Sequence, residues 1–200
     1  MITATKFVWW PRQRYSAVFV FDEELEHIVL IHKLSPAWQA GKANVPGGKV
    51  DAADEPTDCN SPDKPADCTC TETTFRNCAV RELREETGLD IVANALQLVC
   101  RLRYMSREGE TAECYFYATR GSVDAATTVE AERIFAGDVT DVMYGYAYSE
   151  TWSNLAMCWE TESLPTMPNL PYLVAMARQC LRGEGAGSWP LTIYEGSAQC

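Results

Sequence analysis

Three glutamates stand at helical spacing in the segment RELREETGL, residues 81–89. Glu82, Glu85 and Glu86 occupy positions i, i+3 and i+4, so a helix places their carboxylates on one face. These groups repel one another, and two of them lie near the end of the expected helix, where the macrodipole disfavours anions. A half-buried triplet is costly without a cation, because unit charges 4 Å apart repel by about 4 kcal/mol at an effective dielectric of 20.

Hard oxygen ligands of this kind select Mg²⁺ or Mn²⁺. The alternative is a solvated helical face on which Arg81 pairs with Glu85. The upstream run Pro46-Gly47-Gly48-Lys49 bears on this choice, because paired glycines let backbone carbonyls and amides approach an ion or a phosphate closely. Taken alone, the two glycines are equally compatible with a plain tight turn.

The elements that position these groups follow from periodicity. A helix is expected over residues 73–87 and ends at Gly88, with an inward side made of Phe75, Cys78, Ala79 and Leu83. Residues 170–182 have the spacing of a second amphipathic helix. Strands are expected at residues 15–21, 28–32, 92–104 and 112–119, with a further edge strand or docked tail within 189–194. Strands interleaved with two helices predict an α/β/α layered domain.

The segment RELREETGL resembles the signature of the Nudix hydrolase family, which reads Gly, five residues, Glu, seven residues, then Arg-Glu-apolar-any-Glu-Glu-any-Gly-apolar. Gly48 matches its start, and its second half is matched at every fixed place by Arg81, Glu82, Leu83, Glu85, Glu86, Gly88 and Leu89. The resemblance implies a Nudix-type α/β/α sandwich around a mixed β-sheet. It would occupy residues 1–182 and leave a C-terminal tail at 183–200.

One feature departs from the family pattern. The interval between Gly48 and Arg81 is about 19 residues longer than the family spacing, and the polar, proline-rich segment at about 52–71 is expected to be an inserted loop. Counting back from Arg81, the place of the first family glutamate falls on Thr73, and the neighbouring Glu72 is a candidate to supply that side chain by a one-residue shift. Counting forward from Gly48, it falls on Asp54. In the family this glutamate is mostly structural, so the departure leaves activity possible.

The resemblance also implies a mechanism. Glu82, Glu85 and Glu86, with the Gly48 carbonyl, are expected to bind Mg²⁺ or Mn²⁺, and Arg81 to orient them. The general base is expected to be Glu82, Glu86 or a glutamate from a later loop. The expected substrate-binding residues are Gly47, Lys49 and Glu113, and Glu110 is a further candidate ligand or base. The candidates for stacking on the nucleotide base are Trp38, Tyr104, Phe116, Tyr146 and Trp152, although an aromatic residue in a strand more often belongs to the core.

Composition limits the partners. The chain has 28 acidic and 17 basic residues and a formal charge of -11, which disfavours nucleic acid. It shows neither a secretory signal nor a run of about 18 apolar residues, so a cytoplasmic protein without a membrane span is expected. The resemblance leaves a homodimer possible and suggests a small nucleotide substrate. The competing functions are a non-catalytic nucleotide sensor, although a sensor usually lacks one of the glutamates, and an interaction protein that uses the cysteine-bearing loop.

Overall fold

A computed structural model describes residues 11–56, 70–105, 110–122, 133–153, 158–184 and 190–195. Its helices are α1 (Cys70–Thr87), α2 (Val139–Met143) and α3 (Leu170–Leu181), with short 3-10 turns at η1 (Ala52–Asp54) and η3 (Ala93–Ala95). Its strands are β1 (Gln13–Phe21), β2 (His27–Lys33), β3 (Lys42–Asn44), β4 (Gly47–Lys49), β5 (Gln97–Met105), β6 (Thr111–Arg120), β7 (Arg133–Asp138), β8 (Tyr146–Ser153), β9 (Cys158–Pro165) and β10 (Leu191–Glu195).

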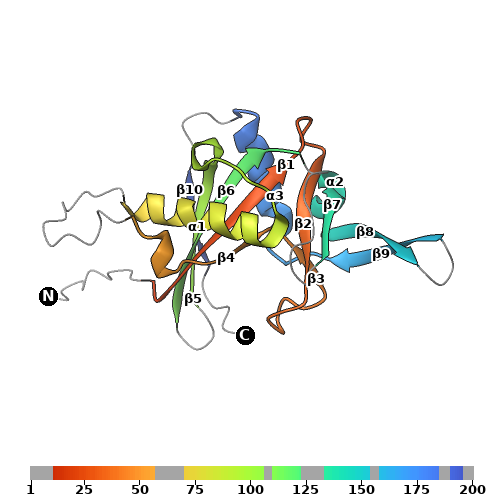
Figure 1. Ribbon diagram of the computed structural model, residues 1–200, viewed down its shortest axis with the longest axis horizontal. Coiled ribbons are helices and arrows are strands. Elements are labelled where there is room, and N and C mark those ends of the chain that lie inside the picture. Colours follow the sequence, from red (N-terminus) through yellow and green to blue (C-terminus); the bar gives the residue numbers. More distant parts are fainter. Residues whose placement is uncertain are drawn as a thin grey trace, which may run out of the picture.

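Eight strands form one mixed sheet (Figure 1). Its order is β10-β5-β6-β1-β2-β3, while β4 pairs with β1 and β7 pairs with β2. The central pair β1 and β6 is parallel, as is the outer pair β10 and β5, whereas β5 and β6 are antiparallel. Strands β8 and β9 form a separate antiparallel ribbon that extends away from the sheet.

Helices cover both faces of the sheet, and strand β1 shows why. Val18 and Val20 pack with the buried side of α1, whereas Phe19 and Phe21 pack with the buried side of α3. Alternate residues of a strand point to opposite faces, so a continuously apolar strand needs an apolar cover on each side. The predicted α/β/α sandwich around a mixed sheet is therefore confirmed.

The inward side of α1 is the one that the sequence predicts. Phe75, Cys78, Ala79 and Leu83 are all fully buried against the sheet. Burying each large apolar side chain contributes roughly 1.5–3 kcal/mol, and this fixes the rotation of the helix about its axis. The helix ends at Gly88, whose φ of +70° is a left-handed conformation. The neighbouring polar positions are thereby turned towards β4 and solvent.

Several element bounds differ from the sequence prediction. Helix α1 begins at Cys70 rather than at 73, and the strand expected from 92 begins at Gln97 because η3 precedes it. The expected edge strand is β10, which runs parallel to β5. Most of the inserted loop, residues 57–69, lies outside the described residues, and the domain limit at 182 stays a prediction. Among the described helices, none has the length and apolar character needed to cross a membrane.

Candidate active site

Two glycines of β4 bring the backbone into close contact with β1 and α1. Gly47 and Gly48 pair with Ala17 and Ser16 of β1. A Cβ atom on Gly47, whose φ is +153°, would collide with the Ser16 carbonyl, and one on Gly48 would collide with the carboxylate of Glu82. Only glycine therefore lets this strand lie between β1 and the carboxylates of α1.

Arg81 connects α1 to the segment that follows β4. Its Nε and Nη2 atoms donate to the two carboxylate oxygens of Asp54, at 3.0 Å each, and Nη2 also donates to the Lys49 carbonyl at 3.0 Å. Its Nη1 atom donates to Glu85 at 2.8 Å and lies 2.9 Å from Glu82. The hydrogen bonds with Asp54, followed by the charge of Glu82, raise the pKa of Arg81, so the guanidinium is a permanent cation.

Asp54, the position reached by counting forward from Gly48, is the residue that pairs with Arg81. Its side chain is 2% exposed, and it closes a capping box in which Asp51 accepts from the Ala53 amide at 2.7 Å and Asp54 accepts from the Asp51 amide at 2.9 Å. Burial raises the pKa of Asp54, but the hydrogen bonds from Arg81 and Asp51 outweigh it and leave the pKa lowered. Glu72 instead lies 2.9 Å from Arg76.

Glu86 is held by two donors from separate parts of the sheet. Its Oε1 atom accepts from the Lys33 ammonium at 2.6 Å, and its Oε2 atom accepts from the Gly47 amide at 2.7 Å. Lys33 is the last residue of β2, so this contact links β2, β4 and the end of α1. Sequence reasoning missed Lys33, because a lysine at a strand end gives no signal that distinguishes it from a solvated charge.

Glu82 has a side chain that is only 15% exposed and lies near two further carboxylates. Burial raises its pKa, and the charges of Glu86 and Glu85 add to that effect, while Arg81 opposes it. Within the described part of the chain no three acidic, His or Cys side chains form a ready metal-binding group; the carboxylates bond to Arg81 and Lys33 instead. The donor set still suits a divalent cation, since it consists of the hard oxygens of carboxylates and a backbone carbonyl.

A large cavity of about 1210 Å³ opens beside these residues. Gly47, Gly48 and Lys33 line it, so it reaches the backbone and the cation that contact α1. Its other walls include aromatic rings, amide side chains, aliphatic side chains and two charged groups. The aromatic residues are Tyr15, Trp38, Tyr104, Phe116 and Tyr172, the amides are Gln13, Gln39, Asn44 and Asn169, and the charged residues are Lys42 and Glu110. This composition suits a ligand that has both a flat ring and hydrogen-bonding groups.

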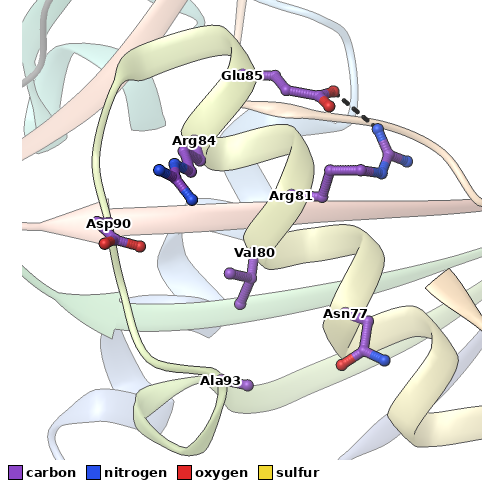
Figure 2. A pocket seen from close by; sticks show the side chains of 7 residues that line it. All are labelled: Asn77, Val80, Arg81, Arg84, Glu85, Asp90 and Ala93. Carbon is purple, nitrogen blue, oxygen red and sulfur yellow. Dashed lines mark hydrogen bonds and ion pairs between the residues drawn. The ribbon is translucent and has the colours of Figure 1, made fainter. Parts of the chain in front are cut away.

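A second cavity of about 580 Å³ lies along the outer surface of α1 (Figure 2). The side chains of Arg81 and Glu85 point towards one another on one side of the helix, and Arg84 points to the other side, where Asp90 lies. Glu85 and Asp90 both line this cavity, Glu85 from the helix and Asp90 from the segment that follows it. This cavity contains no aromatic residue, and its surface is open to solvent.

The NUDIX domain family model matches residues 11–136. The chain belongs to the Nudix family. The matched range contains β1, β4, the whole of α1 and the cavity residues of β5 and β6, so it covers both the glutamates and most of the wall beside them. No curated protein matches the chain in sequence.

Solved Nudix structures share the fold at low sequence identity. A MutT NUDIX hydrolase from Burkholderia pseudomallei is 16% identical with a TM-score of 0.52, and the match covers 84% of this chain and 98% of that one. The NUDIX domain of Shewanella oneidensis NrtR, solved in complex with ADP ribose, is 16% identical with a TM-score of 0.53, over 88% and 90% of the two chains. The chain covers only 45% of the MutT/nudix family protein from Enterococcus faecalis, at 14% identity and a TM-score of 0.48.

The expected Nudix substrate-binding residues lie in different places. Gly47 lines the large cavity, whereas the side chain of Lys49 is exposed and only its carbonyl is used, by Arg81. Glu113 is 4% exposed and accepts from Arg103 at 2.7 Å. On the same strand Ala112 and Cys114 line the cavity, so the side chain of Glu113 points to the other face of the sheet.

Glu110 and the aromatic residues proposed for stacking also differ in whether they line the large cavity. Glu110 lines the cavity, as do Trp38, Tyr104 and Phe116. Tyr146 is exposed on β8 and belongs to neither cavity. The side chain of Trp152, another candidate for stacking, lies outside the described residues.

Proposed function

We propose that this Nudix protein is a divalent-metal-dependent hydrolase that cleaves the diphosphate linkage of a nucleoside diphosphate derivative and releases a nucleoside monophosphate. Nucleoside triphosphates, ADP-ribose and nucleotide sugars are the substrate classes. The observation that carries the proposal is the position of two α1 carboxylates, those of Glu82 and Glu86, against the glycines of β4, which also line the large cavity. Such a site can hold a nucleotide in the cavity with its diphosphate at the glycines.

The chain would hold Mg²⁺ or Mn²⁺ through Glu82, Glu85, Glu86 and the Gly48 carbonyl. Bound there, the ion would neutralise charge on the diphosphate oxygens and lower the pKa of an attacking water. The protein contributes the orientation of the carboxylates, since Arg81 is fixed by Asp54 and in turn contacts Glu82 and Glu85.

Proton removal from the attacking water is assigned to Glu82, to Glu86 or to a glutamate from a later loop, among which Glu110 lines the large cavity. Glu86 accepts hydrogen bonds from Lys33 and from the Gly47 amide, which stabilise its ionised form.

The aromatic walls of the cavity support recognition of the nucleoside. Trp38 is 62% exposed at the cavity edge, and a large exposed ring beside a polar cavity can stack on a base. Tyr172 and Asn169 lie on the opposite element, at the start of α3, where a ring and an amide can contact the same ligand.

A non-catalytic nucleotide sensor is the second candidate. The fold shared with the NUDIX domain of NrtR, which was solved with ADP ribose, favours it. All three glutamates are present in this chain, and that favours the hydrolase. A sensor would bind ADP-ribose without consuming it, so a binding measurement combined with product analysis separates the two.

The test is a turnover screen of nucleoside triphosphates, dinucleotides and nucleotide sugars with Mg²⁺ or Mn²⁺. We expect release of a nucleoside monophosphate, and a rate lower by about 10²-fold or more in Glu85→Gln and Glu86→Gln. Glu72→Gln is the matched control, because Glu72 lies on the same helix but pairs with Arg76. Unchanged rates in both site variants would refute the proposal.

A further inference from the structure

Lys33 is the cation that joins the helix carboxylates to the large cavity. Its ammonium is 2.6 Å from Glu86, the two side chains are only 10% and 15% exposed, and Lys33 also lines the cavity. The Gly47 amide bonds to the other oxygen of the same carboxylate. Glu86 is therefore already neutralised and oriented by groups of the protein itself.

The two cations at these carboxylates differ in how firmly they are fixed. Arg81 is a planar fork whose Nε and Nη2 both bond to the buried Asp54, so its guanidinium cannot leave without breaking that pair. Lysine is a compact charge on a flexible four-carbon stem and can change position at small cost. Lys33, rather than Arg81, is thus the cation that can move.

A divalent cation at Glu86 would compete with this ammonium. The Oε1 atom of Glu86 already accepts from Lys33 and the Oε2 atom from the Gly47 amide, so an ion that binds this carboxylate meets a competing donor at either oxygen. Two positive charges on one carboxylate also repel each other strongly in a partly buried site.

We propose that Lys33 is an internal counter-cation that holds Glu86 in position before the divalent ion binds, and that the ion takes Glu86 from it. Lys33 is thus a positioning residue that keeps the ion affinity of the free protein low. This inference rests on the proposed function, because it takes Glu86 to be an ion ligand. The ammonium is left at the wall of the cavity when the exchange occurs.

The test is Mn²⁺ titration of the free protein, with unbound Mn²⁺ measured by electron paramagnetic resonance and no nucleotide present. We expect Lys33→Met to bind Mn²⁺ about tenfold more tightly than the wild type, because a charge-assisted hydrogen bond no longer competes for the carboxylate. Lys33→Arg keeps the charge and should keep the weaker binding.

Lys42→Met is the matched control for net charge. Lys42 is the cross-strand partner of Lys33 and lines the same cavity, but its ammonium donates to the Trp38 carbonyl at 2.6 Å. We expect its loss to change the Mn²⁺ affinity by less than about twofold, since a more distant charge is screened. In a Glu86→Gln background, Lys33→Met should give no tightening.

Equal or weaker Mn²⁺ binding by folded Lys33→Met would overturn the inference, and so would an equal gain in Lys42→Met. If Lys33→Met does not fold, NMR of protein with ¹³C-labelled lysine is the alternative test. The Lys33 resonance is identified as the one that is missing from the spectrum of Lys33→Arg. This resonance should shift when Mg²⁺ saturates the wild type, and an unchanged position would refute the exchange. A wild type that binds no divalent ion would overturn both this inference and the hydrolase proposal.

Discussion

Removing the charge of Asp54 tests which residue replaces the first glutamate of the Nudix signature. Asp54 accepts two hydrogen bonds from Arg81 and is 2% exposed, whereas Glu72, the other position considered, has a side chain 40% exposed and pairs with Arg76. Breaking a buried ion pair by removing one partner costs about 3–5 kcal/mol. Arg81 keeps its contact with Glu85, so we expect the lower end, about 3 kcal/mol, for Asp54→Asn.

The matched variant is Glu72→Gln, for which an exposed ion pair predicts a loss of about 0.5 kcal/mol. The assay is urea unfolding at pH 7, in which the midpoint of Asp54→Asn should fall while the slope stays constant. The pKa of Asp54 is lowered in the folded state, so the stability that its charge contributes is present above the ordinary value of 3.8 and lost as the pH falls through the folded pKa. The difference between wild type and Asp54→Asn should therefore shrink only below about pH 4.

The reasoning would be refuted if Asp54→Asn lost no more stability than Glu72→Gln, or if its loss were independent of pH down to the acid transition. Asp54→Glu gives a further check, because it restores the residue of the family signature at this position. A longer side chain must push against the buried 3-10 turn, so we expect part of the stability to be lost even though the charge is retained.

Three further outcomes follow. Gly48→Ala should lower turnover at least tenfold with little change in nucleotide affinity, because the added Cβ displaces the Glu82 carboxylate. Equal kcat values for the variant and the wild type would contradict this prediction. The pKa of Glu82 is raised in the folded state, so the stability that its protonated form contributes is present at low pH and is lost as the pH rises through that pKa. Without metal, Glu82→Gln should therefore unfold at a higher urea concentration than the wild type at pH 8. Near pH 4 the two proteins should unfold at similar urea concentrations. Mg²⁺ at about 100 times its dissociation constant should stabilise the wild type by about 2.7 kcal/mol in thermal unfolding, and a similar gain in Glu86→Gln would place the ion elsewhere.

The sequence by itself determined the family, the helix and the glycines. Residues 81–89 match the family signature at every fixed place, and the burial of Phe75, Cys78, Ala79 and Leu83 follows directly from their helical spacing. The strands 15–21 and 28–32 were found within one or two residues of β1 and β2, because continuous β-branched runs leave little alternative. Short elements such as β3, β4 and α2 carry too few residues for a periodic pattern, and tertiary contacts define them.

Only the tertiary structure decided which side chains meet. Spacing pointed to Glu72 by one count and to Asp54 by the other, and the fold closes a capped turn that presents Asp54, not Glu72, to Arg81. It also brought Lys33 to Glu86 from a strand 53 residues away in sequence. Such contacts depend on sheet register and on the rotation of α1, and neither of these is encoded in the spacing of one motif. Local periodicity therefore placed the carboxylates, and long-range packing chose their partners.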